Sequence, residues 1–251
     1  MALHRAERNE PFADERTWHE ALLSLTPEHP DGTAWCMIAP LDRPAFMQAP
    51  VPEGSLDDWA NDRPTPDSLD ILVTSKNQDI KQERQSNAQV DDWIFALVSL
   101  QTAAPYPGSG NYGVSRMNGG SSSRPGLGVE PTGGPGQRWL RDLRIGLEER
   151  PFLVETHGYR DTGGTGLLWL SPWDGKSALG FAALDPFYIE ISRRLRLVEE
   201  QGRIVARRTS SAGPRILKAE ANSRKGNTGD LWTPVERKSG KSLGVSAIGF
   251  H

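Results

Sequence analysis

Apolar side chains recur at the spacing of an α-helix in two stretches, residues 14–25 and 92–103. Positions i, i+3, i+4 and i+7 lie on one face of a helix, so each stretch predicts a short amphipathic helix. Thr26-Pro27 would end the first helix, and Asp91 and Asp92 are good N-cap residues for the second. The apolar positions are Trp18, Ala21, Leu22 and Leu25, then Trp93, Ala96, Leu97 and Leu100.

Two later segments also predict helices, at 137–149 and 185–200. The second, DPFYIEISRRLRLVEE, gives the strongest helix prediction in the chain, with Asp185 as N-cap and Pro186 at the first helical position. The side chains expected to be buried in it are Leu184, Tyr188, Ile191 and Leu195. Three arginines, which fall largely outside this stripe, are expected at a solvated helix end, where cations suit the C-terminal dipole. They are Arg193, Arg194 and Arg196.

Short strands are predicted where apolar and β-branched residues cluster between turn signals. The segments are TAWCMIA, LDILVT, GLLWLSP, RIVARRTS and VSAIGF. Short helices and strands without regular βα alternation favour the α+β class. We therefore expect an α+β fold, a loop-rich globular domain with short helices and small mixed or antiparallel sheets.

The composition agrees with a loop-rich protein, because the 251 residues include 26 Gly and 19 Pro and only 36% are apolar. No apolar run approaches the ~20 residues that span a bilayer. The N-terminal MALHRAERNEPF carries charges where a signal peptide needs its apolar region. We expect a cytoplasmic protein without a membrane partner.

Residues suited to catalysis show no informative spacing. Cys36 is the only cysteine, the five histidines are scattered, and no G-x-S-x-G motif occurs. The sequence therefore predicts no metal, no cofactor and no enzymatic activity. A hydrolase that uses His157 and Asp161 near a glycine-rich turn stays open as a rival.

Charge is distributed unevenly along the chain. Residues 1–70 hold 14 Asp and Glu, 5 Arg and no Lys, whereas residues 191–241 hold 13 Arg and Lys against 5 acids. Such asymmetry is typical of a protein with a face that binds a polyanion. The alternative is charge that is only solvated, which produces the same pattern.

A glycine-rich loop, PYPGSGNYGVSRMNGGSSSRPG at 105–126, follows the predicted helix at 92–103. Gly108, Gly110 and Gly113 have the G-x-G-x-x-G spacing of a dinucleotide site. That site needs a strand before the glycines and a helix that opens at them, whereas here a helix runs into the loop. The order of elements argues against a nucleotide.

Glycines flanked by cations indicate contact with nucleic acid instead. Backbone amides in such a loop can approach a ligand closely, and positive φ can point successive N–H groups at an anion. Arg116 and Arg124 would neutralise phosphates, while Asn111 and Asn118 can bond base edges or sugar. A mobile linker is the alternative, although Tyr112 and other bulky residues interrupt the low complexity.

A second loop of similar character, NSRKGNTGDLW, spans residues 222–232 and carries Arg224 and Lys225. Trp232 stands at its end. We expect this side chain to be a core anchor and not a stacking platform, because Pro234 and Val235 continue the apolar character.

Several long motifs in a shared order resemble the CasA family, the large subunit of the type I-E CRISPR surveillance complex Cascade. The resemblance covers most of residues 44–250, beginning at RPAFMQ. The motifs are DILVTSKNQDIK, DDWIFALVSLQT, GSGNYGVSRMNGGSSSRP, the W-x-x-P-W-D-G at 169–175, LDPFYIEISRRLRL and KGNTGDLWTPV.

The resemblance implies a subunit without catalytic chemistry that sits at the 5′ end of the crRNA. Its partners would be crRNA, target double-stranded DNA, the other Cascade subunits and the recruited helicase-nuclease. It would recognise the protospacer-adjacent motif in the minor groove with the family's glycine loop, which maps to Gly108, Ser109 and Gly110. The crRNA handle would be met near 74–81, with Lys76 and Asn77 as candidates. Lys81 is a further candidate in this segment. The family's lysine that reads the DNA motif would lie in the region of Lys218 to Lys225, where Lys218, Arg224 and Lys225 are the candidate residues.

Residues 1–251 are expected to form a single domain of the CasA N-terminal type. The chain stops shortly after GDLWTPV, so we expect it to lack the family's duplex-splitting wedge and C-terminal four-helix bundle. A structural assembly subunit, which binds guide RNA and protein neighbours without sensing the DNA motif, stays open as the alternative.

Overall fold

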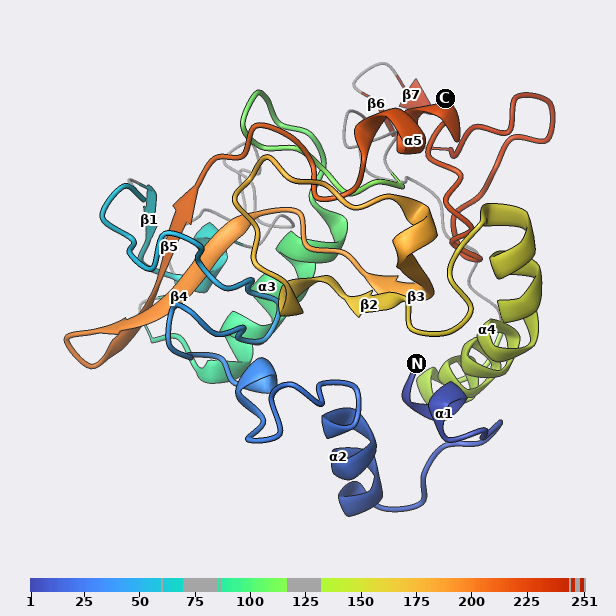
Figure 1. Cartoon of the computed structure of the whole chain (residues 1–251), viewed down its shortest axis with the longest axis horizontal. Coiled ribbons are helices and arrows are strands. Elements are labelled where there is room, and N and C mark those ends of the chain that lie inside the picture. The colour runs from blue at the N-terminus through green and yellow to red at the C-terminus, as the bar shows by residue number, and fades with distance from the viewer. Residues whose placement is uncertain are drawn as a thin grey trace.

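A computed structural model describes residues 1–59, 61–69, 85, 87–116, 132–243, 245–246 and 249–250 (Figure 1). Short helices and strands alternate with long connections, which confirms the predicted α+β class with small sheets. The helices are α1 Ala2–Arg5, α2 Glu15–Leu23, α3 Val90–Ala103, α4 Pro135–His157 and α5 Lys218–Ser223, with short 3₁₀ turns at Thr33–Trp35, Pro66–Ser68, Leu168–Leu170 and Phe181–Ala183. The strands are β1 Asn61–Arg63, β2 Thr165–Leu167, β3 Leu184–Ile189, β4 Arg194–Glu200, β5 Arg203–Thr209, β6 Val245–Ser246 and β7 Gly249–Phe250.

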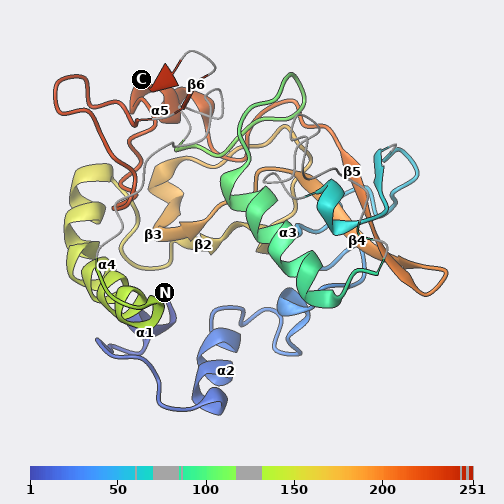
Figure 2. The ribbon, with the colours of Figure 1, turned by 180° about the vertical axis from the view of Figure 1, so that it is seen from behind.

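One core lies between α3 and an antiparallel sheet. Strands β4 and β5 form a hairpin, and β1 pairs with the other edge of β5. Figure 2 shows α3 lying against this sheet in the view from behind. The apolar side chains of α3 pack on the sheet. Helix α3 confirms the prediction at 92–103, but it begins at Val90, so Gln89 is the N-cap and Asp91 and Asp92 lie in the first turn. From there Asp92 accepts a hydrogen bond from the Gln89 amide at 2.7 Å. The buried side chains of this core are Leu69, Trp93, Ala96, Leu97, Leu100, Ala104, Leu195, Leu197 and Ala206.

A second core surrounds Trp169, whose side chain is buried and donates from Nε1 to the Ala34 carbonyl at 3.0 Å. Strands β2 and β3, which pair in parallel, supply Leu167 and Leu184 to it. Helix α2, whose N-cap is Asp14, places Leu22 against the same core. These contacts join segments more than 100 residues apart, so the N-terminal region is part of this core.

The helix predicted at 185–200 is wrong, because the segment forms strands β3 and β4. Asp185 does not cap a helix: its carboxylate accepts from the Phe187 amide at 2.7 Å and from the Arg150 guanidinium at 3.1 Å. The sequence RIVARRT, confirmed as strand β5, supplies a complete ladder of hydrogen bonds to β4. A partner strand close in sequence therefore outweighed the local capping signals.

The arginines expected in solvent on that segment are also placed differently. Arg193 and Arg196 are buried, and Arg194 is half-buried. Arg196 donates to main-chain carbonyl oxygens of the segment 39–49 and so holds this irregular segment against β4.

Several other sequence-based boundaries changed. TAWCMIA begins with a 3₁₀ turn and not with a strand, since the Asp31 carboxylate bonds locally to Thr33 and none of the described strands pairs with it. The strand predicted at 166–172 ends at Leu167, and the helix predicted at 137–149 continues through Pro151 to His157. VSAIGF supplies β6 and β7, while LDILVT falls outside the described residues from position 70 onward.

Within the described part of the chain, no helix is both long enough and apolar enough to cross a bilayer.

Candidate nucleic-acid interface

The glycine-rich segment leaves α3 at Ala104 and is described as far as Arg116. The buried Arg193 guanidinium joins its two arms, because it donates to the carbonyl of Pro105 at 2.9 Å and to that of Tyr112. A Cβ on Gly113 would lie 2.8 Å from the Ala104 carbonyl oxygen, so only glycine lets the arms approach this closely. The loop is therefore closed at its base by one side chain from the start of β4.

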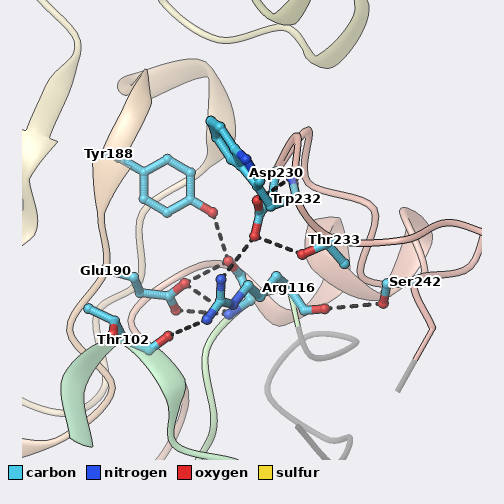
Figure 3. A network of polar contacts seen from close by, with 9 residues as sticks. Thr102, Arg116, Tyr188, Glu190, Asp230, Trp232, Thr233 and Ser242 are labelled. Carbon is cyan, nitrogen blue, oxygen red and sulfur yellow. Dashed lines mark hydrogen bonds and ion pairs between the residues drawn. The ribbon is translucent and has the colours of Figure 1, made fainter. Parts of the chain in front are cut away.

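A buried carboxylate holds the next residue of the loop (Figure 3). The Ser115 amide and hydroxyl donate to Glu190 Oε2 at 2.9 and 2.6 Å, and the Tyr188 hydroxyl lies 2.9 Å from Ser115 Oγ. Burial raises the pKa of Glu190 to about 7, against the opposing effect of the Ser115 donors and of Arg116. Sequence reasoning missed this anchor because Glu190 and Ser115 lie 75 positions apart.

Arg116 continues this network in Figure 3. Its Nη1 pairs with the Asp230 carboxylate at 2.9 Å, and its Nη2 donates to the Thr102 carbonyl at 2.9 Å. The Ser242 hydroxyl donates to the Arg116 carbonyl at 3.2 Å. This arginine, expected to neutralise a phosphate, is thus engaged in fastening the loop to the segment 230–242.

The tip of the loop, residues 108–112, packs on the end of β5. Gly108 and Gly110 have φ of +153° and +81°, a region that favours glycine. The Ser211 amide donates to the Gly110 carbonyl at 3.0 Å, and a Cβ on Gly110 would lie 2.9 Å from Ser210 Cβ. Glycine at this position is required for both conformation and space.

A polar groove of about 540 Å³ runs beside this tip. Exposed Lys176 stands on one side of it, and the half-buried Arg194 borders it while pairing with Glu53. Its lining is completed by Ser109, Gly110, Tyr112, Asp174 and residues 209–212.

Two further cations lie against the tip. Lys218, at the first turn of α5, places Nζ 5.6 Å from the centre of the Tyr112 ring. Arg208 on β5 donates to Asn111 Oδ1 at 3.2 Å. The tip and Lys218 were both expected to bind nucleic acid, and the structure brings them together. Lys176, Arg194 and Arg208 had no signal in the sequence, because they come from segments distant from the loop.

The other predicted residues of the basic region have internal contacts. The Arg224 guanidinium lies 4.0 Å from the centre of the Phe181 ring and donates to the His157 carbonyl at 2.7 Å. Lys225 Nζ donates to the Ser239 carbonyl at 2.9 Å. Arg224 and Lys225, which were predicted to bind nucleic acid, therefore form contacts within the fold.

Two other expectations are changed by the structure. Trp232 is not a core anchor, because 40% of it is exposed. His157 faces Arg224, which together with burial lowers the pKa of its imidazole, and among the described contacts none joins it to Asp161. The local geometry therefore gives the hydrolase alternative no support.

Five candidate residues lie outside the described residues: Lys76, Asn77, Lys81, Asn118 and Arg124. Where the structure does describe the chain, no three His, Cys, Asp or Glu side chains gather as a metal site. Comparisons with protein-family models, with curated proteins and with solved structures find no match to this chain.

Proposed function

We propose that this protein is a non-catalytic nucleic-acid-binding subunit that places its glycine tip, residues 108–112, against target double-stranded DNA. The observation that supports this most directly is the preorganised tip: Arg193 and Glu190 fix its base, while exposed Lys176 and Lys218 stand beside it. Residues 108–110 of the tip are Gly-Ser-Gly and carry no bulky side chain, so this part fits a groove, and the lysines reach the phosphates that flank it. Ordering the loop before binding lowers the entropy cost of recognition.

The resemblance to the CasA family extends this proposal. The chain then acts in the cytoplasm as the large subunit of a type I-E Cascade, recognises the protospacer-adjacent motif, and contacts the crRNA 5′ handle through the segment 74–81. The other Cascade subunits and the recruited helicase-nuclease are its protein partners. Minor-groove contacts by the tip contribute modest discrimination, since that groove mainly separates A·T from G·C.

The double variant Lys176→Gln/Lys218→Gln is expected to bind duplex DNA more weakly and with a smaller dependence on salt. Each phosphate contact contributes about 0.9 to the slope of log K against log salt, so losing two lowers the slope by about 2. Fluorescence anisotropy of a labelled duplex with the purified chain, repeated over a series of salt concentrations, measures both quantities.

Arg16→Gln is the matched control, because Arg16 lies on α2, at the far side of the molecule from the glycine loop in both ribbon views. It removes one exposed charge and should leave the slope unchanged. An unchanged slope in the double variant would contradict the placement of the duplex. If both variants bind DNA as wild type does and the complex still binds guide RNA, the structural assembly subunit is favoured instead.

A further inference from the structure

A cleft of about 350 Å³ opens beside the base of the glycine loop, between β3, the end of α4 and the segment 228–232. Its walls are mostly apolar, with Val114, Leu153 and Phe187 among them and Trp232 at one side. Its polar groups are Arg116, Glu190 and Asp230, which belong to the network of Figure 3. An apolar slot with a few convergent polar groups is the usual form of a site for a small ligand.

The turn that carries Trp232 at this cleft is ordered by Asp230. Asp230 Oδ1 accepts from the Trp232 amide at 3.0 Å, and Asp230 Oδ2 accepts from the Thr233 hydroxyl at 2.7 Å. The turn is therefore fixed while 40% of the tryptophan stays exposed. A partly exposed indole offers a flat surface on which a ligand can stack, and the ordered turn keeps its backbone in place before a ligand arrives.

The polar groups present both donors and acceptors. Each Nη of Arg116 carries a second N–H besides the one used on Asp230 or Thr102, and 32% of this side chain is exposed. The carboxyl groups of Glu190 and Asp230 provide acceptor positions. Donors and acceptors next to an aromatic wall match the edge and the face of a nucleobase.

We propose that this cleft binds one unpaired nucleobase, which stacks on Trp232 and directs its polar edge toward Arg116, Glu190 and Asp230. This inference deepens the proposed function and rests on it for the source of the base. The apolar walls suit the base alone, so the sugar and phosphates stay outside, toward solvent. A base inside a duplex cannot enter, because its edge is paired and both faces are stacked.

Binding of nucleosides to the purified chain tests the site without any phosphate. The indole N–H resonances of ¹⁵N-labelled protein are recorded while each of the four nucleosides, or ribose as a baseless control, is added to millimolar concentration. Trp232→Phe assigns the Trp232 resonance, and Trp139→Phe assigns that of an exposed tryptophan on α4 that does not line the cleft.

At least one nucleoside is expected to shift the Trp232 resonance in a saturable manner, with no such shift from ribose and none at Trp139. Trp232→Ala should weaken that nucleoside about 10-fold, the factor that stacking on one aromatic ring supplies, whereas Trp232→Phe should retain part of the affinity. The thermal unfolding midpoint of each variant shows that it is folded.

A Trp232 resonance that no nucleoside moves, or that ribose moves equally, overturns the inference. If duplex binding still depends on Lys176 and Lys218 when this happens, the proposed function is retained and only the nucleobase site is rejected. Loss of that duplex dependence while nucleosides still shift Trp232 overturns the proposed function and keeps the cleft as a nucleobase site.

Discussion

Replacing Arg196 by methionine is expected to lower the free energy of unfolding by about 3 kcal/mol, because several buried carbonyl groups would lose a charged donor at once. The side chain is fully buried, and its guanidinium donates to the carbonyl oxygens of Ala39 at 2.7 Å and Arg43 at 3.0 Å, among others. Burial lowers the pKa of Arg196 to about 10, which still leaves it charged at neutral pH. Methionine fills much of the space but offers no donor. Urea denaturation followed by circular dichroism measures the loss.

Arg203→Met is the matched control, since Arg203 is exposed on β5 of the same hairpin. Surface substitutions of this kind usually change stability by less than about 0.5 kcal/mol. Equal effects of the two variants would mean that the segment 39–49 does not depend on Arg196. A large loss only at Arg196 would establish that a single buried cation organises this irregular region.

The second large effect concerns pH. The free energy of unfolding is expected to fall by about 3 kcal/mol as the pH rises from about 4.5 to 7, through the contribution of Glu190 alone. Burial raises the pKa of this carboxyl from 4.5 to about 7 in the folded chain. The folded state therefore binds an extra proton in that window, and stability present below pH 4.5 is lost as the pH rises through 7. The groups that face Glu190 are Ser115, Tyr188 and Arg116.

Glu190→Gln isolates this contribution, because glutamine keeps the shape and an oxygen acceptor for Ser115 but does not titrate. Urea denaturation of both proteins over the same pH series gives the difference that belongs to Glu190, since all other titrating groups are shared. Wild type should be less stable relative to the variant at pH 8 than at pH 5. Parallel pH profiles for the two proteins would contradict the raised pKa.

Only the second of these predictions concerns the candidate interface, because Glu190 holds the glycine loop whereas Arg196 holds the segment 39–49. Arg193 and Glu190 hold the two ends of the segment 105–115, and the tip between them meets Ser210 and Ser211. Stability and binding are thus connected: a loosened base would leave the tip with more conformations to lose when DNA binds.

The sequence by itself determined the elements whose signals are local. Helices α2 and α3 follow from apolar side chains at helical spacing, and β5 follows from its β-branched pattern. It also singled out the glycine tip and Lys218 as parts of one candidate site. Positive φ at Gly110 is a local requirement, which is why its residue type could be interpreted without a fold.

Only the tertiary structure decided what lies between and around these elements. The segment 185–200 became two strands because β5 paired with β4, and this buried Arg193 and Arg196, which local periodicity had placed in solvent. Lys176 and Arg208 reached the glycine tip from distant segments. Trp232 is 40% exposed, although the apolar residues that follow it had indicated a core position. Burial and ion-pair partners depend on residues far apart in the chain, and even the pairing of the adjacent strands β4 and β5 is decided by contacts that no local periodicity specifies.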